Sequence, residues 1–148
     1  MFNLTRELAL SNVAEEPDNI RMLFNLLLAR PKGISHEFVP NYNEHTNFVV
    51  THPYVAWYFV LADGVPVGSC YIKDDNSIGL NSEFENYEEL SNVLQMLLKR
   101  HVPQPEIKSV RPAYFYINVS SNNARIQQQL AAIGLNPIQL SFRIPPQL

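Results

Sequence analysis

The spacing of apolar residues along the chain predicts both helices and strands. The window 17–30 carries one apolar stripe with the spacing of a helix face, at Ile20, Leu23, Phe24, Leu27 and Leu28. The window 87–102 repeats that spacing, whereas 55–61 and 65–72 are β-branched and aromatic runs that favour strands. In chain order the predicted elements are a strand at 4–12, helices at 17–30 and 43–50, strands at 55–61, 65–72 and 77–81, a helix at 87–102, a strand at 113–119, a helix at 123–133 and a last strand at 138–144.

Turn and capping residues punctuate this pattern. Asp63-Gly64 between two strand runs predicts a tight hairpin. Asn86, followed three residues later by Glu89, predicts a helix start with a capping box, and Gly134 predicts a helix end. No linker, repeat or low-complexity tract divides the chain. We therefore expect a single domain over residues 1–148 with a mixed α+β (α/β) fold whose first half is antiparallel.

Composition narrows the classes of partner. The 148 residues suffice for one domain with a buried core, and 46% of them are hydrophobic. The formal net charge is −3 and the basic residues are scattered, so we expect neither nucleic acid nor a membrane surface as a partner. The first residues lack the pattern of a secretion signal and no apolar run is long enough to span a bilayer, so we expect a cytoplasmic protein. Cys70 stands alone in an apolar run, which indicates a buried, unreactive thiol.

Two stretches carry a family resemblance. The first is YFVLADGVPVGSCYI at 58–72, with Gly68 inside its second strand run. The second, at 117–135, is a strand followed by a helix that has Asn123 at its start and Gly134 at its end. With these stretches the chain resembles the GNAT superfamily of acyl-CoA-dependent N-acyltransferases. The resemblance implies one GNAT-like domain with a central, mostly antiparallel, twisted sheet, about four helices and splayed central strands.

The same resemblance implies a site for acetyl-CoA as co-substrate. In GNAT proteins the pantetheine arm pairs with backbone groups between the fourth and fifth strands, as an added strand would. The residues that the resemblance places at the cofactor are Leu80, Asn81, Ser82, Asn118 and Asn123.

Candidate catalytic residues lie in the polar segment 33–53, which covers the acceptor site in the family. Glu44 or His45 is expected to act as the general base that takes a proton from a small-molecule primary amine, with an amino sugar as one candidate. A His on a polar segment is also often simply solvated, and that alternative stays open. His36, His45 and His52 are separated by nine and seven residues, a spacing that does not indicate a metal site.

A second hypothesis starts from residues 82–89, where the family carries a Gly-containing pyrophosphate loop. Here the segment reads SEFENYEE, with no Gly and with four glutamates that would repel phosphate. The alternative is therefore a GNAT-like domain that binds no cofactor and serves as a binding or assembly module. Under this hypothesis the apolar face of 138–144 pairs two copies in a homodimer.

Overall fold

The structure is a computed structural model that describes residues 6–29 and 41–148. Its elements are β1 Leu8–Asn12, α1 Pro17–Ala29, α2 Tyr42–Thr51, β2 Ala56–Ala62, β3 Val65–Ile72, β4 Ser77–Ser82, α3 Tyr87–Arg100, β5 Tyr116–Ile117 and α4 Ala124–Ile133. His36, in the polar segment, lies outside the described residues.

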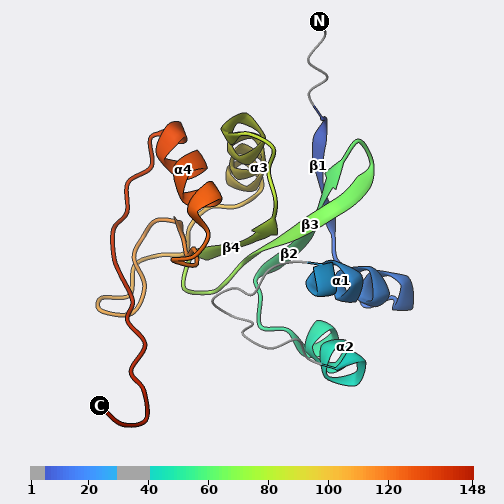
Figure 1. The fold of residues 1–148 in the computed structure, drawn as a ribbon, viewed down its shortest axis with the longest axis horizontal. Coiled ribbons are helices and arrows are strands. Elements are labelled where there is room, and N and C mark those ends of the chain that lie inside the picture. Colours follow the sequence, from blue (N-terminus) through green and yellow to red (C-terminus); the bar gives the residue numbers. More distant parts are fainter. Residues whose placement is uncertain (1–5, 30–40) are drawn as a thin grey trace, which may run out of the picture.

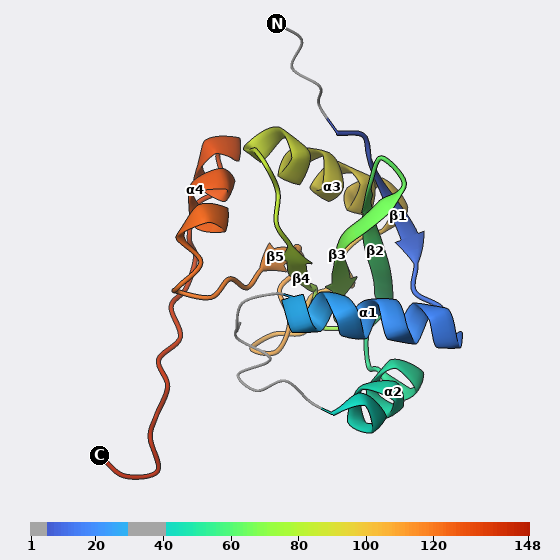
Figure 2. The ribbon, with the colours of Figure 1, turned by 45° about the vertical axis from the view of Figure 1, so that its right-hand side comes forward.

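One sheet organises the molecule, with the strand order β1-β2-β3-β4-β5 (Figures 1 and 2). All neighbouring strands are antiparallel except β4 and β5, which are parallel. Alternation along β2 sends Tyr58 and Val60 to one face, where α3 and α4 pack, and Phe59 to the other, where α1 and α2 pack. The mixed α+β fold with a mostly antiparallel sheet is confirmed.

The β2–β3 hairpin forms as its sequence predicts. Asp63 and Gly64 both have positive φ, 49° and 81°, which matches a two-residue turn with two left-handed residues. Gly134 ends α4 in the left-handed conformation, with φ of 100°. In both places the backbone conformation explains the residue type.

Two predicted strands differ from the structure. The strand predicted at 113–119 is reduced to the two residues of β5, which pair with β4 on one side only. The strand predicted at 138–144 is wrong, because the structure assigns no strand there. A strand is defined by pairing with a neighbour, and this segment extends away from the sheet (Figures 1 and 2).

The capping box was predicted at one helix and is found at another. Asn86 caps α3 by accepting from the backbone N–H of Glu89, but the Glu89 carboxylate accepts from the N–H of Glu85. The complete box stands at α2, where Asn41 and Glu44 accept from each other's backbone N–H.

Candidate functional site

The parallel ladder between β4 and β5 stops before β4 ends. The Tyr116 N–H donates to the Asn76 carbonyl at 3.2 Å, and the last aligned pair is Ile78 with Ile117. The next rung would join Leu80 to Asn118, and the pairing ends before it. Since β4 continues to Ser82, its end has no strand partner on the β5 side, and we call this opening the β4–β5 gap.

Alternation along β4 decides which backbone groups face this gap. The Lys73 N–H donates to the Ser77 carbonyl at 2.9 Å, so Ser77 points its backbone groups toward β3. Asn81, in register with Ser69, therefore also points them toward β3. Leu80 and Ser82 point their amide and carbonyl groups toward the gap. These two residues thus offer backbone groups to a strand-like ligand, whereas the backbone groups of Asn81 face β3.

Close packing against β3 fixes the end of β4. A Cβ atom added to Gly68 would lie 2.6 Å from the Asn81 carbonyl oxygen and closer still to the Ser82 hydroxyl. Only glycine therefore permits this approach of the two strands. The Ser82 Oγ atom is buried at this contact without a hydrogen-bond partner in the described part of the chain.

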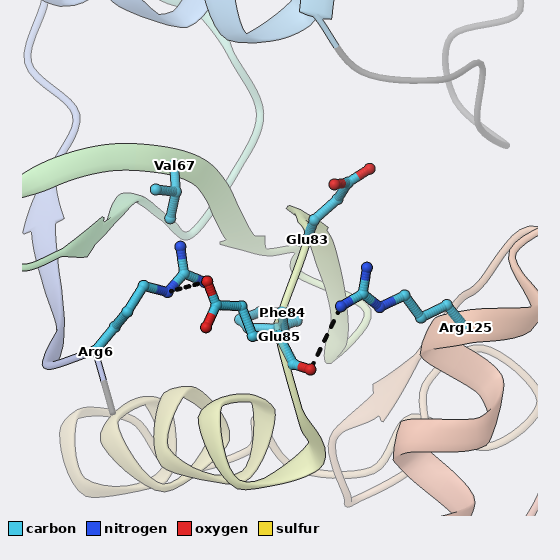
Figure 3. Close-up of a pocket in the computed structure, with 6 residues that line it drawn as sticks. All are labelled: Arg6, Val67, Glu83, Phe84, Glu85 and Arg125. Atoms are coloured by element: carbon cyan, nitrogen blue, oxygen red, sulfur yellow. Dashed lines mark hydrogen bonds and ion pairs between the residues drawn. The ribbon is translucent and has the colours of Figure 1, made fainter. Parts of the chain in front are cut away.

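A cavity of about 300 Å³ lies where β4 leads into α3, and Figure 3 shows its lining. Its walls come from the N-terminal segment, from β3, from the β4–α3 connection and from the first turn of α4, and consist of Arg6, Val67, Glu83, Phe84, Glu85 and Arg125. Arg125 donates to the Glu85 carbonyl at 3.4 Å, so the β4–α3 connection and α4 are linked across the cavity.

Side-chain hydrogen bonds and ion pairs already occupy the start of α3. Arg6 donates to both carboxylate oxygens of Glu89, from Nε at 3.0 Å and from Nη2 at 2.8 Å, and lies 3.3 Å from the Glu85 carboxylate. Glu89 is only 4% exposed, and the Arg6 hydrogen bond holds the pKa of its carboxyl below its usual value. A buried carboxylate thus already occupies the electropositive end of this helix.

The start of α4 carries no such charge cluster. Asn123 accepts from the Ile126 N–H at 3.2 Å and caps the helix, and the first turn holds no acidic residue. Asn118 and Asn123 are both exposed. Asn118 follows β5 directly, so the structure brings it to the opposite side of the gap from Leu80.

Glu44 and His45 lie elsewhere, on α2, at the end of the molecule opposite α3 and α4 (Figures 1 and 2). His45 is 5% exposed, and its Nε2 lies 3.0 Å from the Ile20 carbonyl of α1. Burial lowers the pKa of His45 and thereby favours its neutral ring. Glu44 is exposed and caps its own helix. The structure does not bring these two residues to the β4–β5 gap.

An aromatic cluster on the α2 side of the sheet was missed by the sequence analysis. The Tyr54 and Tyr71 rings stack with their centroids 4.0 Å apart. The Trp57 ring lies edge-on to the Tyr54 ring, with a centroid separation of 5.1 Å. The Tyr71 ring covers Gly79 of β4, where a Cβ atom would clash with it. The Trp57 Nε1 is buried without a hydrogen-bond partner among the described residues. The usable signal was strand alternation, which puts Trp57 and Tyr71 on one face.

Three further features bear on the chemistry. Cys70 is buried, and burial raises the pKa of its thiol to about 12, so it is unreactive as predicted. Within residues 6–29 and 41–148, no three His, Cys, Asp or Glu side chains converge on a position for a metal ion. Over the same ranges no helix combines the length and the apolar character needed to cross a bilayer.

Comparison with known proteins supports the fold. Neither a protein-family model nor a curated protein sequence matches this chain. Among solved structures, a possible acetyltransferase from Clostridium difficile 630 superposes with a TM-score of 0.54 at 10% sequence identity. The match covers 95% of this chain and 98% of that one. At this identity the likeness shows a shared fold alone, which is consistent with a GNAT-like arrangement.

Proposed function

We propose that this protein is an N-acyltransferase that moves an acetyl group from acetyl-CoA to the primary amine of a small molecule. The observation that carries the proposal is the β4–β5 gap, where the ladder ends at Ile78 and Ile117 while β4 continues. The backbone groups of Leu80 and Ser82 face that opening, and the amides of a pantetheine arm can pair with them as an added strand would.

The gap also suits the chemistry of acyl transfer. Amine attack on a thioester develops negative charge on the carbonyl oxygen, and a fixed backbone N–H stabilises it. The Leu80 N–H is such a donor, on a strand held by β3. The amine must lose a proton, and Glu44 and His45 are the proposed bases. Both lie on α2, away from the gap, and His45 is buried, so the exposed Glu44 would take this proton through intervening water. Glu44→Gln is expected to lower kcat if this role is correct.

Calorimetry with acetyl-CoA tests donor binding in this gap. We expect Asn118→Trp to fill the mouth of the gap and weaken acetyl-CoA binding at least tenfold. The matched control is Asn122→Trp, also exposed but placed in the turn before α4. Release of free thiol in the presence of a panel of amines reports turnover. The proposal fails if the wild-type chain binds no acetyl-CoA at millimolar concentration.

A second candidate function, a binding or assembly module without a cofactor, is favoured by the start of α3. Phosphate binds to helix starts whose amides are free and electropositive. Here Arg6 is paired with Glu89, and Glu83 and Glu85 also line or border the cavity. The paired Arg6 and the glutamates argue against a pyrophosphate at this helix start, although Arg125 also lines the cavity, while the gap supports a pantetheine arm.

Comparing acetyl-CoA with acetyl-pantetheine separates the two candidates. If the gap binds the donor while the α3 start contributes nothing, the two ligands will bind with affinities within about threefold of each other. Binding of neither ligand favours the cofactor-free module. A strong preference for acetyl-CoA would show that the α3 start accepts pyrophosphate after all.

A further inference from the structure

The segment after α4 exposes an apolar stripe. We call residues 136–148 the C-terminal arm, which extends away from the sheet and the helices in both views (Figures 1 and 2). Every second residue in its middle is large and apolar, and these residues are 62–84% exposed: Ile138, Leu140, Phe142 and Ile144. In an extended chain such residues share one side. A stripe of this kind marks a surface that is covered by a partner.

The sheet offers an edge that matches the arm. β5 is the last strand of the sheet and pairs with β4 on its inner side. The Tyr116 N–H points inward to Asn76, so alternation turns the amides of Phe115 and Ile117 outward. Within the described residues no strand pairs with that outer side. An unpaired edge of this kind accepts an added strand.

The surroundings of β5 are apolar as well. The connector between α3 and β5 exposes several large apolar residues, namely Val102, Ile107, Val110 and Tyr114. Arg111 holds this connector by donating to the carbonyls of Pro105, at 2.8 Å, and Asp74, at 3.1 Å. The exposed apolar residues are therefore presented on an ordered segment that leads directly into the edge strand.

We propose that the C-terminal arm of one copy adds as a strand to the outer edge of β5 in a second copy, and that the exchange is reciprocal. Pro137 restricts the preceding residue to extended conformations, which carries the arm outward from the end of α4. Reciprocal exchange of an identical segment builds a closed twofold dimer at low cost. It pairs the β5 edge and covers the arm's apolar side in both copies at once.

Light scattering and sedimentation of the full chain at 10–50 μM, on the order of the concentrations at which such dimers assemble, test the proposal. The wild-type chain is expected to be a dimer. Leu140→Asp with Phe142→Asp is expected to raise the dimer dissociation constant at least a hundredfold. Gln139→Asp with Ser141→Asp places two charges on the other side of the same strand and is expected to leave the dimer intact. A monomeric wild-type chain, or equal effects of the two pairs, overturns the proposal.

Cross-linking identifies which surfaces meet. In a Cys70→Ala background, a chain with Asn118→Cys is mixed with a longer, tagged chain that carries Ser141→Cys. Because Asn118 follows β5 directly and Ser141 lies mid-arm, a disulfide between the two chain lengths is expected. Disulfides only between two arms would show that the arms pair with each other and would overturn the proposal. So would an intrachain 118–141 disulfide in a doubly substituted monomer.

Discussion

The two walls of the β4–β5 gap are built in opposite ways. The β4 wall is a six-residue strand that pairs with β3 along Gly68–Ile72 and ends in a helix start saturated by Arg6 and Glu89. The β5 wall has two paired residues and leads to a helix start at Asn123 with no acidic residue in its first turn, and then to the exposed arm. One wall is thus fixed by continuous backbone pairing, and the other presents exposed groups.

The buried side chain of Asn76 helps to hold the β5 wall in place. Asn76 is 1% exposed, and its Nδ2 donates to the carbonyls of Gln104 at 3.0 Å and Pro112 at 2.7 Å. Its Oδ1 accepts from the Gln104 N–H at 2.9 Å, and its own carbonyl receives the first ladder bond from Tyr116. Asn76 therefore contributes to the position of β5, and with it to the width of the gap, together with the Arg111 contacts to the same connector.

The largest expected effect comes from removing that side chain. Asn76→Ala leaves one partly buried amide and two partly buried carbonyls without this partner and forces alanine into a left-handed conformation, since φ is 70°. We expect a loss of about 3 to 4 kcal/mol in the free energy of unfolding, measured by urea titration.

Asn76→Gly separates the two causes. Glycine tolerates the positive φ, so this variant is expected to recover about 1 kcal/mol of the loss while the hydrogen bonds stay broken. An Asn76→Ala variant as stable as the wild type would show that the connector and β5 are held by other contacts.

The next effect concerns the β4 wall. Glu89→Ala removes the partner of Arg6 and of the Glu85 N–H, both partly buried, and is expected to cost about 2 to 3 kcal/mol of unfolding free energy. Glu88→Ala, exposed in the same helix turn, is the matched control and is expected to change stability by less than about 0.5 kcal/mol. Equal losses in the two variants would contradict the pairing described here.

The same residue predicts a pH dependence. The pKa of Glu89 is held below its ordinary value of 4.5, chiefly by the Arg6 hydrogen bond. Its contribution to stability is therefore fully present above pH 4.5 and is lost as the pH falls through the lowered pKa of the folded state. Thermal melts of wild type and Glu89→Gln should converge as the pH drops below 4.5. Parallel pH profiles would refute this contribution.

The features of this region that the sequence predicted correctly depend on residues close together in the chain. The apolar stripe of α3 needed no other information, because Leu90, Val93 and Leu97 lie three or four residues apart and are all fully buried. The hairpin turn at Asp63-Gly64 and the helix end at Gly134 were equally local, because positive φ selects those residue types.

The predictions that differ from the structure concern residues whose contacts come from distant parts of the chain. The Glu89 carboxylate turned from its predicted capping contact to Arg6, 83 residues earlier. His45, predicted in a polar segment, is buried because α1 supplies the Ile20 carbonyl. The strand at 138–144 has the right alternation, but alternation states only that a partner is needed and does not provide one. The roles of Glu44, His45 and the five cofactor residues stay predictions.

The smallest expected change in stability concerns Asn123 on the β5 side of the gap. Its side chain caps α4, and it is also a predicted contact of the acetyl donor. Asn123→Ala removes the cap on Ile126 and is expected to cost about 1 kcal/mol of unfolding free energy. Asn123→Ser and Asn123→Asp both retain a capping oxygen but remove the Nδ2 donor, so their stability should stay within about 0.5 kcal/mol of the wild type. If Asn123 also binds the donor, both variants will bind acetyl-pantetheine more weakly while melting normally. Unchanged binding in both would leave Asn123 as a helix cap and shift the β5 side of the site to Asn118, because Asn118 lies opposite Leu80 at the point where the ladder ends.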